Sequence, residues 1–84
     1  MISSEIIEGI KGPLELAEFV KVLHKSYVDN PQSWENDNLA TYLDAIAAWV
    51  LDSDGYFRNN NQPLPNPETW KVVAMILYAA TMYE

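Results

Sequence analysis

The sequence predicts an all-α fold, and three observations support this prediction. Apolar residues recur at spacings of three and four in three segments, residues that start or stop helices lie at the ends of these segments, and alternating strand patterns are poor. The predicted main helices cover residues 13–29, 37–53 and 67–83. We expect all 84 residues to form one small domain, a compact bundle of these helices.

The first predicted helix, residues 13–29, begins at a proline, a residue that suits the first helical position. Asn30-Pro31 ends it, because the residue before a proline avoids helical geometry. One face of this helix is apolar and consists of Leu16, Phe19, Val20, Leu23 and Tyr27. The preceding residues contain Ile6, Ile7 and Ile10 and are compatible with a short helix or with an extended arm.

The second predicted helix, residues 37–53, follows Asn36, whose side chain suits the N-cap position. Gly55 is placed to supply the left-handed residue that commonly ends a helix. Its apolar stripe consists of Leu39, Tyr42, Leu43, Ile46, Trp49 and Val50. Residues 56–65 then form a connection longer than the roughly 2–8 residues usual between bundled helices.

The third predicted helix, residues 67–83, has Asn66 as its N-cap and Pro67 as its first residue. Apolar residues lie on nearly every side, and such a helix must be surrounded. The side with the least predicted cover is a stripe of Lys71, Met75, Tyr78 and Met82. Either the N-terminal arm or the connection covers this stripe, or it is a dimer or groove-binding face.

Net charge and composition limit the classes of partner. Twelve acidic residues against five basic ones give a charge of −7, which disfavours nucleic acid. The absence of cysteine rules out disulfides and thiolate chemistry. The acidic N-terminus does not resemble a signal peptide, and the longest apolar run, residues 72–80, is too short to span a membrane. We therefore expect a cytoplasmic protein that binds neither nucleic acid nor membrane.

Candidate catalytic and metal-binding residues are few. Asp52-Ser53-Asp54-Gly55 is similar to part of a calcium loop, but Val50 and Asn61 would then occupy its first and twelfth positions. A helix-ending turn explains these residues better. His24 is the only histidine, and catalysis would need carboxylates brought to it by the fold. We expect no catalytic residue, no metal and no cofactor.

Trp34 lies outside the predicted helices, where an exposed tryptophan can mark an interaction surface, although packing is the favoured alternative. It is grouped with the stripe of the third helix as the candidate interaction surface. This set contains Lys71, Met75, Tyr78, Met82 and Trp34.

Two blocks of the sequence carry a resemblance to a known family. The first begins with Trp34-Glu35-Asn36 in the pattern W-E-N-x-x-L-x-x-Y-L, and the second begins with Trp70 in the pattern W-x-x-x-A-x-x-L-x-A-A-x-x-Y-E. With these blocks the chain resembles a family of small bacterial proteins catalogued as a domain of unknown function. The resemblance implies no activity and assigns no site residue.

The function expected from these observations is a non-catalytic protein-interaction module that binds a protein partner or a second copy of itself. The alternative is an acidic antagonist, of the immunity-protein type, that inhibits a basic toxin or enzyme. A small enzyme that uses His24 and carboxylates is a further, disfavoured alternative.

Overall fold

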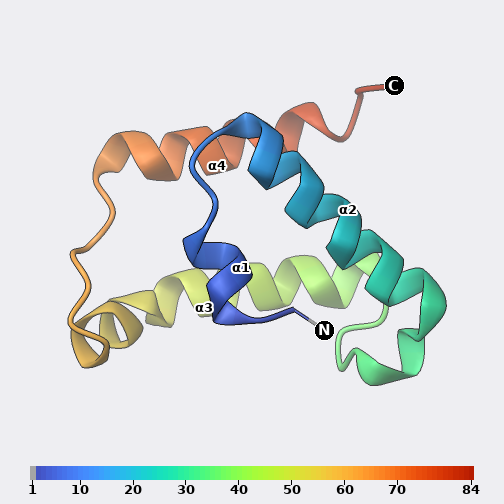
Figure 1. Ribbon diagram of the computed structural model, residues 1–84, viewed down its shortest axis with the longest axis horizontal. Coiled ribbons are helices and arrows are strands. Elements are labelled where there is room, and N and C mark those ends of the chain that lie inside the picture. Colours follow the sequence, from blue (N-terminus) through green and yellow to red (C-terminus); the bar gives the residue numbers. More distant parts are fainter. Residues whose placement is uncertain (1) are drawn as a thin grey trace. The chain divides into compact units, whose positions relative to one another are not determined.

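The computed structural model describes residues 2–84, and within that range every regular element is a helix (Figure 1). This confirms the predicted all-α fold class and, of the two alternatives left open for the N-terminal residues, shows the short helix. The elements are α1 (Ser4–Glu8), α2 (Pro13–Asp29), the 3-10 helix η1 (Pro31–Ser33), α3 (Leu39–Asn59) and α4 (Pro67–Ala79).

The chain forms two compact units, Met1–Ile46 and Ala47–Glu84, which we call the first and second units. The first contains α1, α2, η1 and the start of α3, and the second contains the rest of α3 and α4. The expectation that residues 1–84 form a single bundled domain stays a prediction.

α2 has the bounds predicted from the sequence. Pro13 is its first residue, and the extended backbone of Gly12 precedes it. At the other end the amide of Asn30 donates to the carbonyl of Ser26, and Pro31 then starts η1. The proline rule therefore placed the C-terminus of α2 correctly.

The predicted start of the second helix was wrong by two residues, because Asn38 and not Asn36 is the N-cap of α3. The Asn38 side-chain oxygen accepts a hydrogen bond of 2.9 Å from the amide of Thr41. The carbonyl of Asp37 accepts the hydroxyl of Tyr27 at 2.6 Å, and this contact holds residue 37 outside the helix. Asn36 and Asn38 both suit the N-cap position, and the contact with α2 is what favours Asn38.

The predicted end of the second helix was also wrong, because α3 continues through Gly55 to Asn59. Gly55 does not have a positive φ, and the residue that adopts the left-handed conformation is Asn61, with φ 54°. The amide of Gln62 donates to the carbonyl of Phe57, and the amide of Asn61 donates to that of Arg58. These two bonds form a Schellman motif with asparagine in the position usually held by glycine.

α4 begins as predicted and ends earlier than predicted. The side-chain oxygen of Asn66 accepts from the amide of Thr69 at 2.9 Å, which confirms Asn66 as N-cap, and Pro67 is the first helical residue. The regular helix stops at Ala79 and not at residue 83. The Thr81 hydroxyl and amide both donate to the carbonyl of Tyr78, so the chain tightens into turns there.

The connection between α3 and α4 covers residues 60–66, so it is shorter than the predicted stretch of residues 56–65. It is shorter because α3 takes up Tyr56 and Phe57. Of the helices described in residues 2–84, none combines the length and apolar character needed to cross a membrane.

Candidate functional site

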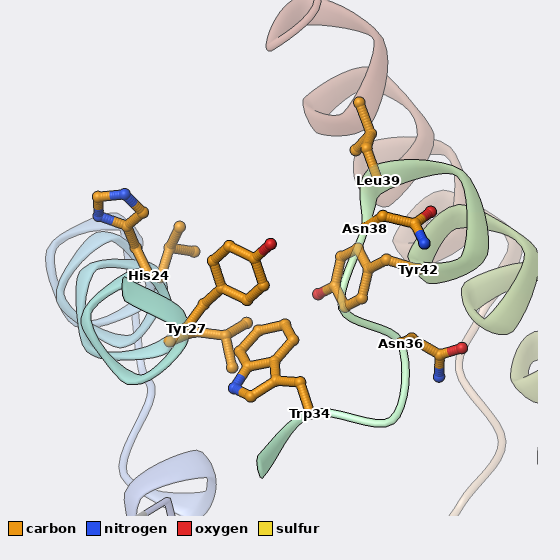
Figure 2. A pocket seen from close by; sticks show the side chains of 9 residues that line it. His24, Tyr27, Trp34, Asn36, Asn38, Leu39 and Tyr42 are labelled. Carbon is orange, nitrogen blue, oxygen red and sulfur yellow. The ribbon is translucent and has the colours of Figure 1, made fainter. Parts of the chain in front are cut away.

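The first unit contains a pocket of about 470 Å³ between one face of α2, the segment after η1 and the first turn of α3 (Figure 2). α2 contributes four residues at positions i, i+3, i+4 and i+7, the spacing of a single helix face. The lining residues are Val20, Leu23, His24, Tyr27, Trp34, Asn36, Asn38, Leu39 and Tyr42. We call this site the aromatic pocket.

Three aromatic rings form the centre of the pocket, with Trp34 between the two tyrosines (Figure 2). The Tyr27 ring meets Trp34 edge-on, with ring centroids 5.2 Å apart and an interplanar angle of 70°. The Tyr42 ring is tilted by 41° at a centroid distance of 5.7 Å. Such pairs contribute about 0.5–1.5 kcal/mol each beyond their buried area. The rings therefore connect α2 to the start of α3 through Trp34.

The polar tips of two of these rings are used within the unit. The Trp34 indole nitrogen donates to the Ser26 hydroxyl at 3.1 Å, and the Tyr27 hydroxyl donates to the Asp37 carbonyl at 2.6 Å. Tyr27, Trp34 and Tyr42 are each partly buried. The Trp34 and Tyr27 rings consequently offer mainly carbon surface to anything that enters the pocket.

The remaining polar lining does not make a catalytic group. His24 is exposed, and its imidazole points away from the three rings (Figure 2). Asn38 uses its side-chain oxygen as the helix cap, and no carboxylate lines the pocket beside His24. General acid–base or nucleophilic chemistry needs such a partner within hydrogen-bond reach. The lining of the pocket is therefore mainly apolar.

Acidic residues lie next to pocket-lining residues in the sequence, and they outnumber the basic residues of the first unit. Glu35 and Asp37 flank the lining residue Asn36, both are exposed, and neither forms an ion pair within residues 2–84. Residues 1–46 contain eight carboxylates and three lysines, a formal balance of −5 with His24 neutral. The unit with the pocket thus carries most of the net charge of −7.

A second hollow in the same unit, about 680 Å³, lies beside the C-terminal half of α2 and shares Trp34 with the aromatic pocket. Its charged groups already pair with each other, because the Lys25 ammonium donates to the Asp29 carboxylate at 2.7 Å. This hydrogen bond, together with the negative charge of Asp29, raises the pKa of Lys25 above its usual value. The hollow offers no free charged group from this pair.

The predicted interaction stripe divides between a helix and a turn. Lys71, Met75 and Tyr78 lie on α4, whereas Met82 lies in the turns after it. Met75, Tyr78 and Met82 are 67%, 69% and 65% exposed. The Lys71 ammonium lies 3.6 Å from the Glu68 carboxylate, one turn earlier on the same helix.

Trp34 belongs to the first unit and not to the unit that contains the stripe. It is half-buried between two rings, the packing arrangement that the sequence favoured for it. Sequence analysis did not predict that Tyr27, Trp34 and Tyr42 meet. The available signal was three aromatic residues spaced seven and eight apart across the Asn30-Pro31 helix stop.

The segment similar to a calcium loop, Asp52-Ser53-Asp54-Gly55, lies within α3 and therefore cannot wrap around an ion as a loop. The Asp54 carboxylate forms an ion pair with the Arg58 guanidinium at 2.9 Å across one helical turn. Ser53 is 4% exposed, and its hydroxyl donates to the Val50 carbonyl. In residues 2–84 no three His, Asp or Glu side chains gather in a way that could hold a metal ion.

Comparison with known proteins matches residues 14–84 to a family model. No curated protein and no solved structure matches the chain. The matched region starts at the second residue of α2 and includes both the aromatic pocket and α4. Because it covers most of the sequence, the resemblance to a domain of unknown function is confirmed, and the chain belongs to the Family of unknown function (DUF7660).

Proposed function

We propose that this protein is a non-catalytic protein-interaction module that associates with a second copy of itself through α4. The observation that carries the proposal is that α4 exposes large apolar residues on several of its sides. The exposed apolar residues of this helix are Val72, Val73, Met75, Ile76, Leu77 and Tyr78.

A short helix with exposed apolar residues is stabilised when another surface buries those residues. α4 has 13 residues, and isolated helices shorter than about 12–15 residues are marginal in water. A helix that is hydrophobic all round is typical of a buried position. Burial of the α4 face against another protein surface would therefore stabilise the helix as well as the complex.

Local charge favours a second copy as the occupant. The only charged residues in α4 are Glu68 and Lys71, which lie 3.6 Å apart and leave the helix without net charge. Two α4 helices can therefore approach each other without the repulsion that a net charge of −7 predicts for other faces. A two-fold interface places the same patch on both subunits, and Met and Tyr side chains are enriched in such interfaces.

Analytical ultracentrifugation over a range of micromolar concentrations tests self-association. We expect the wild-type chain to form dimers and the double variant Met75→Glu, Tyr78→Glu to sediment as a monomer. Leu51→Glu is the matched control, because Leu51 is 83% exposed on α3 in the same unit. A wild-type chain that remains monomeric at every concentration, or a control that dissociates equally, contradicts the proposal.

The charge of the first unit favours a second candidate, an acidic antagonist of a basic toxin or enzyme. With a balance of −5 on residues 1–46, this unit would be steered towards a basic partner. Such an antagonist would bind its target more weakly as salt concentration rises, whereas α4 self-association would not weaken. A partner recovered by affinity capture and bound independently of salt would argue against this role.

The same charge argues against nucleic acid as a partner, because no basic patch offsets the repulsion of the phosphates. The absence of a carboxylate beside His24 in the aromatic pocket supports a non-catalytic role. A cytoplasmic location stays a prediction.

A further inference from the structure

We propose that the aromatic pocket of the first unit is a second docking site, which takes apolar side chains from a basic amphipathic helix of a protein partner. This inference rests on the proposed role as an interaction module. It does not depend on self-association through α4, which involves residues of the other unit.

The lining of the pocket favours an apolar occupant. The indole nitrogen of Trp34 and the hydroxyl of Tyr27 are already bonded to Ser26 and Asp37, and the side-chain oxygen of Asn38 caps α3. An incoming ligand therefore gains chiefly by burial of its own apolar groups at the rings, Val20, Leu23 and Leu39. A phosphate group finds no lysine or arginine in the lining.

The pocket has the size and rigidity of a binding site. Its volume of about 470 Å³ lies within the range of roughly 300–1,000 Å³ that ligand sites occupy. Hydrogen bonds of 3.1 Å and 2.6 Å fix the Trp34 and Tyr27 rings. Because these rings are held before a ligand arrives, docking loses little side-chain entropy at them.

The charge near the pocket selects a basic partner. Glu35 and Asp37 flank the lining residue Asn36 and have no ion-pair partner within residues 2–84. Of the three lysines in this unit, Lys25 is paired with Asp29. An occupant with Lys or Arg beside its apolar residues would complement the excess of carboxylates, whereas an anionic membrane surface would be repelled.

A helix is the element that presents such a pattern most simply. An amphipathic helix places apolar anchors at i, i+3, i+4 and i+7 and can carry lysines on either side of that stripe. The pocket accepts the anchors, and Glu35 and Asp37 are available to the flanking lysines. The combination of an apolar pocket and an acidic unit therefore indicates a basic amphipathic helix.

The test uses the full chain and a synthetic peptide in which leucines at helical spacing are flanked by lysines. Isothermal titration calorimetry measures the dissociation constant, and the NMR signal of the Trp34 indole N–H reports where the peptide binds. We expect binding that weakens with salt and shifts the Trp34 signal. A peptide with glutamates in place of the lysines, and one with the same composition scrambled, are expected not to bind.

Matched variants assign the binding to the pocket. The double variant Val20→Gln, Leu39→Gln alters two exposed lining residues, and we expect it to weaken binding by about tenfold or more. Its control, Leu14→Gln with Val28→Gln, alters two residues of α2 that are similarly exposed and do not line the pocket. Equal loss in both double variants, or no binding by the wild-type chain, overturns the proposal.

A second pair of variants tests the charge. Glu35→Gln with Asp37→Asn should weaken binding several-fold and reduce its salt dependence, whereas Glu5→Gln with Glu8→Gln removes the same charge from α1 and should have little effect. Equal effects of the two pairs would contradict a role for Glu35 and Asp37. The Met75→Glu, Tyr78→Glu variant should keep peptide binding, so failure of the pocket and failure of α4 self-association are distinguishable.

Discussion

The contacts within the first unit differ in kind from the contacts within the second unit. In the first unit, residues from separate elements meet: Tyr27 of α2 bonds to Asp37, and Trp34 lies between Tyr27 and Tyr42. In the second unit, Trp49, Tyr56 and Phe57 also form an aromatic cluster, but all three belong to α3. The first cluster connects elements, and the second only reinforces one helix.

This difference has a consequence for function. A unit whose elements are connected by its own side chains can present a preformed pocket. A unit whose contacts are local leaves α4 with exposed apolar sides, as the proposed self-association requires. For this reason we propose a preformed binding pocket in one unit and a self-associating face in the other.

The largest expected effect comes from removal of the ring that connects the elements of the first unit. Trp34→Ala should destabilise this unit by about 3 kcal/mol, the lower end of the range for such truncations, because Trp34 is half-buried. Trp49→Ala, in which the lost ring is 51% exposed and its aromatic partners Tyr56 and Phe57 lie on the same helix, should cost clearly less. Urea unfolding followed through NMR amide signals of each unit measures both, and equal losses would refute the comparison.

The sequence correctly predicted the helix ends that depend on a proline or on an asparagine cap at the end itself. Pro13, Pro31 and Pro67 mark a start, a stop and a start as predicted, and Asn66 caps α4. The existence and type of all three main helices followed from apolar spacing.

Prediction from sequence was wrong where two residues suited the same helix-end position, and where contacts between distant residues set the structure. Gly55 was predicted to end the second helix, yet Asn61 does so, and only the position of the Schellman bonds distinguishes them. The bond from Tyr27 to the Asp37 carbonyl set the start of α3, and helical periodicity contains no information about it. For the same reason the aromatic pocket was not predicted, although Tyr27 and Tyr42 were assigned to apolar helix faces; Trp34 was grouped with the candidate interaction surface.

The contact between α2 and the segment before α3 provides the next test. Tyr27→Phe removes the hydroxyl that donates to the Asp37 carbonyl and leaves the ring beside Trp34 in place. We expect a loss of about 1 kcal/mol in the first unit, since this is the usual net worth of one hydrogen bond. Tyr56→Phe in α3 is the control, because no side-chain hydrogen bond of the Tyr56 hydroxyl is present in residues 2–84. Thermal unfolding by circular dichroism gives both values, and an unchanged Tyr27→Phe variant would show that the rings alone connect the elements.

The wrong prediction for Gly55 leads to a stabilising substitution in the second unit. Gly55 lies within α3, has no positive φ, and an added Cβ would meet nothing within 4 Å. Gly55→Ala should therefore stabilise α3 by about 0.4–1 kcal/mol, through higher helix propensity and a less flexible unfolded chain. A rise in the unfolding midpoint confirms the helical assignment, whereas destabilisation would return Gly55 to a helix-ending role.

The smallest expected effect concerns the exposed ion pair between Lys25 and Asp29 on α2. The hydrogen bond to Asp29 and its negative charge raise the folded-state pKa of Lys25 above 10.5. The pair therefore contributes its stability below that pH and loses it as the pH rises through the raised pKa. Both side chains are largely exposed, so the contribution is small. An NMR titration of wild type and Asp29→Asn should show the Lys25 pKa fall in the variant.

The α3 pair of Asp54 and Arg58 has the same spacing and provides the comparison between units. Arginine remains charged in alkaline solution, so this pair should persist where Lys25 has lost its proton. If pairs within one helix contribute little in both units, Asp29→Asn at neutral pH will reduce the helicity of α2 slightly and leave the Trp34 indole signal in place. Loss of the Trp34 signal in that variant would mean that the ion pair, and not the aromatic contact, connects the elements of the first unit.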